Sequence, residues 1–323
     1  IMLKNKKILI TGAGGFIGSH LTEELLKHDN FVVSIYRHIL QFVFLEKQLN
    51  GIIENYKLHE NYELYKDDLL DSSVYNRIET DIEYVFHLAA QAGVRYSLEH
   101  PSEVSYNNIV STVNVFEFSK KLENLKKVVF ASSSSVYGNP IYTPVDEQHP
   151  KNPISPYAVS KLSGELYGEL YYREFNLPIT SLRFYTVYGP RGRPDMAIRK
   201  FFNLILQGIE LTIYGDGTQL RDFTFISDII SGLILAGENQ KANGEIFNLG
   251  KSNPIVVNDL VEYMHEIAKK PKKVRYIEKQ KGDVEVTHSN IEKAKKILNY
   301  HPKISIREGL SKQYNWQVSF NSN

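Results

Sequence analysis

Hydrophobic and polar positions along the chain predict short buried strands that alternate with amphipathic helices. Strand-like apolar runs occupy residues 7–11, 31–35, 84–88, 127–131, 179–184 and 245–249. Apolar residues recur at helical spacing between most of these runs, most clearly over 104–122 and 157–175. Strands that alternate with helices in this way pair in parallel, and the helices then cover both faces of one sheet. The pattern therefore predicts an α/β fold built on a Rossmann-type doubly wound parallel sheet.

The pattern of predicted elements changes after Tyr185. Loop-like sequence follows, and the later elements are short and interrupted by glycine, proline and lysine. We expect residues 1–185 to form the Rossmann domain, with 221–250 returning to it. The remaining segments then form a smaller C-terminal α/β region that binds the substrate, namely 186–220 and 251–323.

The composition and net charge exclude several classes of partner and of catalytic chemistry. The 323 residues carry a net charge of +1, so no long-range field draws the protein to nucleic acid or to an anionic membrane. There is no cysteine, which excludes disulfides, thiolate catalysis and cysteine-bound metals, and the scattered histidines predict no metal site. The apolar run at 8–10 is too short for a signal peptide or a membrane span, so we expect a cytoplasmic protein.

A glycine-rich turn follows the first predicted strand. The sequence TGAGGFIG places glycines at 12, 15 and 18 between that strand and a helix. One glycine permits the tight turn, another lets a pyrophosphate approach the backbone, and the third lets the helix pack close to the strand. We expect a dinucleotide to lie against Gly12, Gly15, Phe16, Ile17 and Gly18.

The end of the second predicted strand bears on the choice between NAD and NADP. A carboxylate usually stands there and holds the ribose 2′-hydroxyl of NAD, but this chain has Tyr36, Arg37 and His38. Without a carboxylate, a 2′-phosphate would not be repelled, and it could pair with the side chain of Arg37 or His38. The local chemistry therefore slightly favours NADP. NAD stays open, because Tyr36 can stack on adenosine while the two bases face solvent.

Two tyrosine-lysine pairs have the spacing YxxxK. Tyr157 and Lys161 open a predicted helix after a proline, downstream of a serine run at 132–135. Tyr62 and Lys66 precede a turn, and we expect that second pair on the surface. Because positions i and i+4 share one face of a helix, Lys161 can hold its ammonium near the Tyr157 phenol. A neighbouring cation favours the phenolate, so Tyr157 is the candidate base.

Six further motifs occur in order along the chain. They are HLAAQAGVRYS from His87, ASSSSVYG from Ala131, SPYAVSK from Ser155, RFYTVYGPRGRPDM from Arg183, RDFTFISD from Arg221 and KGDV from Lys281. Together they resemble the extended short-chain dehydrogenase/reductase family, and most closely its nucleotide-sugar 4-epimerases acting on UDP-glucuronate, UDP-glucose and their relatives. The resemblance spans most of the chain.

The resemblance implies a mechanism. Tyr157, helped by Lys161, takes the proton of the sugar 4-hydroxyl while a hydride passes from C4 to the nicotinamide, and Ser133 hydrogen-bonds the same oxygen. The resulting 4-keto sugar turns about its diphosphate link, and the hydride returns to the opposite face. The substrate changes configuration at C4, the cofactor is regenerated, and no net redox change occurs.

The same resemblance bears on the sugar. The family's dehydratases carry Asp-Glu directly after the residue that matches Ser133, whereas this chain has Ser134 and Ser135. Hydroxyls cannot supply the acid and the base of a 4,6-dehydration, so that reaction is disfavoured. Uronate epimerases use the corresponding hydroxyls to hold the sugar carboxylate, with a Thr and an Arg that match Thr186 and Arg193. This favours a UDP-hexuronate, although neutral or N-acetylated sugars remain open.

The family pattern assigns further contacts. The remaining cofactor residues are Asp68 at the adenine amine, Leu69, Leu88, Ala89 and Ala90, together with the catalytic Tyr157 and Lys161. The remaining substrate residues are Arg95, Arg221 at the UDP diphosphate, and Tyr214 and Asp283 at the uridine. The family also implies a homodimer, joined through the helices predicted over 104–122 and 157–175.

Two other functions fit the same motifs. A reductase that consumes exchangeable NADPH to reduce a 4-keto sugar nucleotide would keep Ser133, Tyr157 and Lys161 unchanged. A non-catalytic dinucleotide sensor could share the fold, but such a protein has no need of the catalytic residues.

Overall fold

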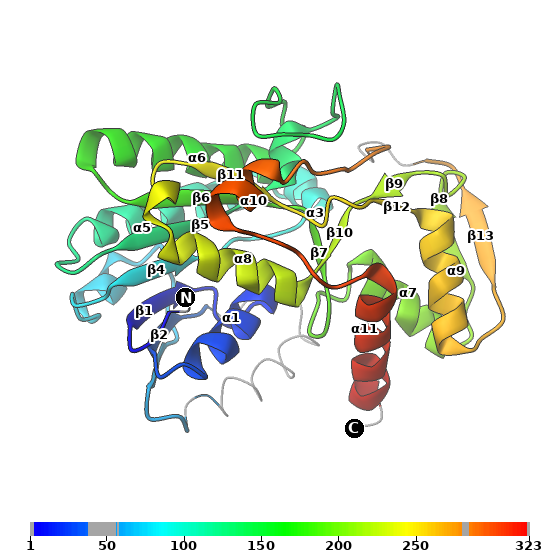
Figure 1. Cartoon of the computed structure of the whole chain (residues 1–323), viewed down its shortest axis with the longest axis horizontal. Helices are drawn as coiled ribbons and strands as arrows, with labels where there is room; N and C mark the ends of the chain where they lie inside the picture. The colour runs from blue at the N-terminus through cyan, green and yellow to red at the C-terminus, as the bar shows by residue number, and fades with distance from the viewer. Residues whose placement is uncertain (1–2, 38–55, 57, 280–283, 322–323) are drawn as a thin grey trace.

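The computed structural model of the chain describes residues 3–37, 56, 58–279 and 284–321. Its centre is a seven-stranded sheet of order β11-β6-β5-β4-β1-β2-β3, in which every neighbouring pair runs parallel (Figure 1). The strands are β1 (Lys7–Thr11), β2 (Phe31–Ile35), β3 (Tyr62–Tyr65), β4 (Tyr84–His87), β5 (Lys127–Ser133), β6 (Ile179–Phe184) and β11 (Ile246–Leu249).

Successive side chains of the central strands enter two different cores. On β1, Ile8 and Ile10 pack into one core while Leu9 packs into the other, and all three are fully buried. On β5, Val129 joins the core of Ile8 and Phe130 joins the core of Leu9. Both faces of these strands are covered, which is why their sequences read as unbroken apolar runs.

Helices cover the two faces of the sheet. Helix α1 (Phe16–Leu26) and helix α8 (Ile226–Glu238) pack on one face, and α5 (Ser111–Ser119) and α6 (Pro156–Phe175) pack on the other (Figure 1). Helix α6 approaches the sheet closely at Gly164, where an added Cβ would lie 2.3 Å from the Phe130 ring. Shorter helical segments are α3 (Val94–Glu99), α4 (Pro101–Ser105), α10 (Glu292–Leu298), η2 (Ser72–Asn76), η4 (Ser134–Tyr137) and η5 (Gln240–Ala242).

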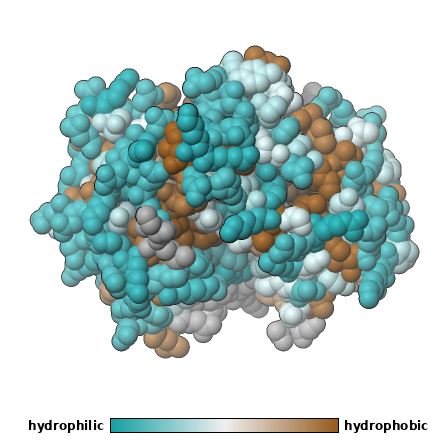
Figure 2. All heavy atoms as spheres, viewed as in Figure 1, coloured by the Kyte–Doolittle hydropathy of each residue, from teal (hydrophilic) through white to brown (hydrophobic). Residues whose placement is uncertain are grey.

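A smaller C-terminal region lies beside this sheet and shares its core. Its helices α7 (Ala197–Leu206), α9 (Val257–Ala268) and α11 (Ile306–Asn321) pack together, and β8 (Leu211–Tyr214) pairs in parallel with β13 (Val274–Ile277) (Figure 1). Two further strand pairs connect the regions: β7 (Thr186–Tyr188) with β10 (Phe223–Phe225), and β9 (Leu220–Arg221) with β12 (Ile255–Val256). Figure 2 shows a mostly hydrophilic surface on this side of the molecule, with smaller apolar patches.

The predicted fold class is confirmed, while one predicted helix is irregular and one residue expected on the surface is buried. The helix predicted over 104–122 is α4, then a π-helical turn, η3 (Tyr106–Val110), and then α5. Tyr62, expected on the surface, is buried in β3, while Lys66 is exposed. The domain boundaries stay a prediction. In the part of the chain that the structure describes, no helix is long and apolar enough to cross a membrane.

Candidate active site

Ser133 and Tyr157 lie at the carboxyl edge of the parallel sheet. Ser133 is the last residue of β5, and its hydroxyl accepts hydrogen bonds from the backbone N–H and the hydroxyl of Ser135 at 3.2 and 2.9 Å. Tyr157 sits in the first turn of α6, which begins at Pro156 and is capped by Ser155. Ligands of open α/β sheets bind at this edge, beyond the carboxyl ends of the strands.

Lys161 lies one helical turn after Tyr157 and is buried. Its ammonium donates to the Ala131 carbonyl of β5 at 2.6 Å and lies 5.9 Å from the centroid of the Tyr157 ring. Burial lowers the pKa of Lys161 to about 8, against the opposing charge of Glu165. The ammonium is therefore held at a fixed point between strand and helix.

The Tyr157 phenol is not acidified by Lys161 alone. Burial raises its pKa, while the charge of Arg193 and an interaction with the Ser133 side chain lower it. A further positive charge is needed beside the phenol before the phenolate is favoured at neutral pH.

A buried ion pair lies beneath these residues and was not predicted from the sequence. Glu165 of α6 accepts two hydrogen bonds from Arg183 of β6, at 2.8 and 2.7 Å, and one from Ser132 of β5. Both charged side chains are almost inaccessible to solvent. One carboxylate thus joins the three elements around Ser133 and Tyr157. Its position four residues after Lys161, on the same helix face, was the available signal.

A second buried polar group connects the sheet to the π-helical turn. His87 of β4 lies 2.7 Å from the Thr11 hydroxyl and 2.9 Å from the Thr112 hydroxyl. Asn108, within the π turn, hydrogen-bonds the backbone of Gln91 and donates to Ser160 of α6. Burial, with a smaller contribution from Lys161, lowers the pKa of His87 to about 3, so this histidine is neutral.

The glycine-rich turn fits the pyrophosphate of a dinucleotide. Gly12 has φ of +75°, and an added Cβ would lie 2.8 Å from the backbone of Ala89. An added Cβ at Gly18 would lie 2.1 Å from the Gly12 carbonyl, so helix α1 approaches the turn as closely as the motif requires. No side chain caps α1 among the described residues, which leaves the N–H groups of its first turn, at Phe16 and Ile17, for an anion.

The residues after β2 lie against this turn. The Tyr36 ring covers Gly14, where an added Cβ would overlap it at 2.3 Å. Arg37 donates to Asp68 at 2.5 Å, so these two residues form an ion pair. Asp68 is the residue predicted to contact the adenine amine. His38 lies outside the described residues.

The remaining predicted cofactor residues follow β3 and β4. Leu69 is buried, and its carbonyl accepts hydrogen bonds from Tyr75 and Asn114. The Leu88 and Ala89 amides donate to the backbone and side chain of Thr11, and Ala90 is half-buried beside them. The structure thus brings the ends of β1, β2, β3 and β4 together around the glycine-rich turn.

The predicted sugar-binding residues come from two segments. Ser134 and Ser135 begin η4 directly after Ser133, whereas Thr186 begins β7 and Arg193 lies in the loop that follows. Arg193 donates from Nε and Nη2 to the two carboxylate oxygens of Asp195, at 3.0 and 2.7 Å. The sequence analysis gave Asp195 no role.

The loop that carries Arg193 is tied to the predicted cofactor helix. Arg191 is buried and donates to Glu23 of α1 at 2.7 Å. An added Cβ at Gly192 would lie 3.7 Å from the Phe16 ring. The loop therefore rests on α1, and Arg193 is positioned relative to the glycine-rich turn.

The predicted nucleotide-binding residues lie at the junction of the two regions. The Arg95 guanidinium of α3 lies 5.4 Å from the centroid of the Tyr214 ring of β8, so the structure brings these two together. Arg221 donates to the carbonyls of Leu220 and Glu285 at 2.9 and 3.0 Å. Asp283 lies outside the described residues.

Asp222, which the sequence analysis missed, fixes the neighbouring loops. Its carboxylate accepts hydrogen bonds from the amides of Lys251, Ser252 and Ser289, and from the Ser289 hydroxyl. The side chain is fully buried. Because it directly follows Arg221, it sets the position of that arginine.

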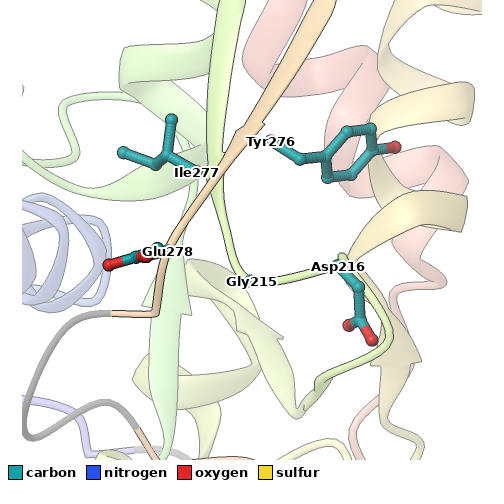
Figure 3. A pocket seen from close by; sticks show the side chains of 5 residues that line it. All are labelled: Gly215, Asp216, Tyr276, Ile277 and Glu278. Carbon is teal, nitrogen blue, oxygen red and sulfur yellow. The ribbon is translucent and has the colours of Figure 1, made fainter.

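A wide, shallow hollow of about 660 Å³ lies next to Tyr214. Gly215, Asp216, Tyr276, Ile277 and Glu278 line it at the ends of β8 and β13, as Figure 3 shows. The Tyr276 hydroxyl donates to Asn258 of α9 at 3.0 Å. The hollow adjoins the predicted uridine side of the site and contains none of the predicted catalytic residues.

Comparison with known proteins identifies the family. The family model of GDP-mannose 4,6-dehydratase matches residues 9–313. The chain belongs to this family of extended short-chain dehydrogenase/reductases. The family carries the name of a dehydratase, but the similar proteins described next are 4-epimerases.

Members of the family resemble this chain over nearly its whole length. The UDP-glucuronate 4-epimerase of Thermodesulfobacterium geofontis is 40% identical over 313 residues, which cover 95% of each chain. The crystal structure of UDP-glucuronic acid 4-epimerase from Bacillus cereus, with UDP-glucuronic acid and NAD, is 37% identical, with a TM-score of 0.90 over 97% of this chain and 99% of that one.

A third structure shows a different sugar in a similar protein. The UDP-N-acetylglucosamine 4-epimerase from Methanobrevibacter ruminantium, in complex with UDP-N-acetylmuramic acid, is 32% identical, with a TM-score of 0.90 over 98% of this chain and all of that one. The predicted family and the predicted class of reaction, nucleotide-sugar 4-epimerisation, are confirmed.

Proposed function

We propose that this protein inverts C4 of a UDP-hexuronate, with a tightly held NAD. The observation that carries the proposal is the grouping of Ser133, Tyr157 and Lys161 at the same sheet edge as the glycine-rich turn, with hydroxyls at Ser134 and Ser135. Dehydration needs an acid and a base at those two positions, whereas 4-epimerisation does not. The similar proteins that act on UDP-glucuronate support the same substrate class.

Tyr157 is the proton acceptor and donor in this proposal. It takes the proton of the 4-hydroxyl as C4 is oxidised, holds it while the keto sugar turns, and returns it to the same oxygen. Ser133 donates a hydrogen bond to that oxygen, and Lys161 stabilises the phenolate. The nicotinamide, when bound, supplies a reversible hydride acceptor and the positive charge that the phenol needs.

The substrate is oriented by residues from both regions. Thr186, Arg193 and the hydroxyls of Ser134 and Ser135 hold the sugar carboxylate. Arg221 pairs with the diphosphate, and Tyr214, Asp283 and Arg95 hold the uridine end. A bidentate arginine matches the planar carboxylate of a uronate and has no such partner on a neutral hexose.

We infer NAD as the cofactor, although the sequence around Tyr36 slightly favours NADP. Arg37 is paired with Asp68, so the charge of Arg37 is compensated and a carboxylate lies beside the residues that follow β2. A carboxylate there repels a 2′-phosphate. NAD in the similar B. cereus structure supports the inference.

We also propose the predicted homodimer, with α6 at its interface. The solvent side of α6 carries Val159, Leu166 and Leu170, which are exposed at 44%, 59% and 38%. A second copy of this helix would cover such a stripe. The cytoplasmic location stays a prediction.

The test is turnover of UDP-glucuronate by the purified protein without added cofactor. Epimerisation gives UDP-galacturonate, which NMR distinguishes at C4. Mass spectrometry of the denatured protein then identifies the dinucleotide that it releases. The proposal fails if product appears only with added NADPH, in proportion to its consumption, because that result identifies a reductase.

A further inference from the structure

Asp195 occupies the hydrogen-bonding face of Arg193. Nε and Nη2 of the guanidinium each donate to a different oxygen of the carboxylate, at 3.0 and 2.7 Å. This parallel pair of bonds is the arrangement by which arginine recognises any carboxylate, including that of a uronate. A substrate carboxylate that seeks the same two donors meets them already engaged.

The Arg193 guanidinium lies near the candidate base. The charge of Arg193 acts on the Tyr157 phenol, so the guanidinium lies near the reacting oxygen. Arg193 and Thr186, the two residues predicted to hold the sugar carboxylate, also line one small cavity of about 20 Å³. The engaged donors therefore lie close to both Tyr157 and Thr186, within the proposed sugar site.

The two partners differ in their freedom to move. The Arg193 side chain is 22% exposed and that of Asp195 is 45% exposed. Asp195 follows Arg193 by two residues in a loop, so its carboxylate can turn into solvent while the guanidinium stays in place. Solvation then compensates the carboxylate, and the arginine is left for another anion.

We propose that Asp195 is a specificity-determining residue that substitutes for the substrate carboxylate on Arg193. This rests on the proposed function. When the sugar is neutral, Asp195 stays on the guanidinium and no charge is left unpaired in the site. When the sugar is a uronate, its carboxylate displaces Asp195. The exchange lowers the preference for uronates below the value that Arg193 alone would give, and it keeps neutral UDP-hexoses acceptable.

The test compares the binding of two ligands in the presence and in the absence of the Arg193 side chain. Calorimetry gives the Kd of UDP-glucuronate and of UDP-glucose for the dinucleotide-loaded protein and for Asp195→Asn. The preference for UDP-glucuronate is the Kd of UDP-glucose divided by the Kd of UDP-glucuronate. We expect this ratio to rise about fivefold in Asp195→Asn, which corresponds to about 1 kcal/mol. Asp195→Glu keeps a carboxylate within reach, so its preference should stay closer to that of the wild type.

The second part of the test uses Arg193→Ala, which removes the shared partner. There the further change Asp195→Asn should leave the preference unaltered, since additivity fails only between interacting residues. The inference is overturned if Asp195→Asn weakens UDP-glucuronate at least as much as UDP-glucose, because Asp195 then only orients Arg193. It is also overturned if the preference rises equally without Arg193. A wild-type protein that binds neither ligand overturns the proposed function as well.

Discussion

The residues beneath Tyr157 and the residues that face the predicted sugar nucleotide are held by different means. The first group lies on β5, β6 and α6 and is fixed by buried polar contacts such as the pair of Glu165 with Arg183. The second lies in loops and short strands. Apart from the buried Asp222, which fixes the loops next to Arg221, it is held by partly exposed contacts such as that of Arg193 with Asp195. A fixed reaction centre beside an adjustable binding face lets related chains keep one reaction while their substrates differ.

Removal of the Tyr157 hydroxyl should produce the largest effect and should separate chemistry from binding. We expect Tyr157→Phe to lower kcat about 10⁴-fold, equal to ~5 kcal/mol of barrier, because the proton acceptor is lost. UDP-sugar affinity should change little. Steady-state kinetics and calorimetry measure the two quantities.

Tyr62→Phe is the matched control for that variant. Tyr62 has the same YxxxK spacing and is a buried tyrosine outside the candidate site. Removal of its hydroxyl should leave kcat unaltered. If kcat fell by a comparable factor in both variants, Tyr157 would not be the proton acceptor of the reaction.

The buried ion pair should account for the next largest effect, on stability. Glu165→Gln leaves the buried Arg183 charge without its anion, and we expect the free energy of unfolding to fall by about 4 kcal/mol. Glu169→Gln is the control, because Glu169 lies on the same helix in an exposed pair with Arg173 at 3.3 Å. Urea denaturation measures both. An equal, small loss in the two variants would contradict the idea of a rigid reaction centre.

His87 should make the reaction centre sensitive to acid. Burial lowers its pKa to about 3 in the folded protein, whereas the unfolded chain binds a proton near pH 6.5. The unfolded state therefore holds more protons between these values, and stability falls as pH drops through that window. At pH 4 the loss from His87 is on the order of 3 kcal/mol.

The variant His87→Gln should lose part of this dependence. Urea denaturation at pH 7 and pH 4 measures the difference, and the exposed His59, changed to Gln, serves as the control. An unchanged pH dependence in His87→Gln would show that the imidazole contributes nothing to acid sensitivity.

The binding face should tolerate substitution best. Tyr214→Leu removes the ring under Arg95, and we expect the free energy of unfolding to fall by less than about 1 kcal/mol. Affinity for the UDP-sugar should fall more clearly, while Tyr214→Phe keeps the ring and both properties. A stability loss as large as that of Glu165→Gln would erase the contrast between the two regions.

The sequence predicted the sheet better than it predicted the contacts between its elements. The strands at 31–35 and 179–184 match β2 and β6 to the residue, because strands buried on both faces appear as continuous apolar runs. The π-helical turn was missed, since apolar spacing over 104–122 reads as one regular helix. Tyr62 was misplaced because its strand, at the sheet edge, is half polar.

The candidate site divides in the same way. The glycine-rich turn and the residues Ser133, Tyr157 and Lys161 could be found, because their chemistry requires fixed local spacing. The partners of Arg183 and Asp222 could not, because the fold brings them together from positions far apart in the chain. Asp195 lies only two residues after Arg193, but two opposite charges in a loop usually indicate an exposed surface segment, so the sequence analysis assigned Asp195 no role.

The π turn at Tyr106–Val110 acts as a single-residue insertion in an otherwise continuous α-helical path. Deletion of one residue there would restore regular winding and rotate the preceding helix by roughly 100° about its axis, since an α-helix has 3.6 residues per turn. The Asn108 amide would then leave Gln91 and Ser160. Chains of this family that differ in length at this point should therefore also differ in how they support the reaction centre.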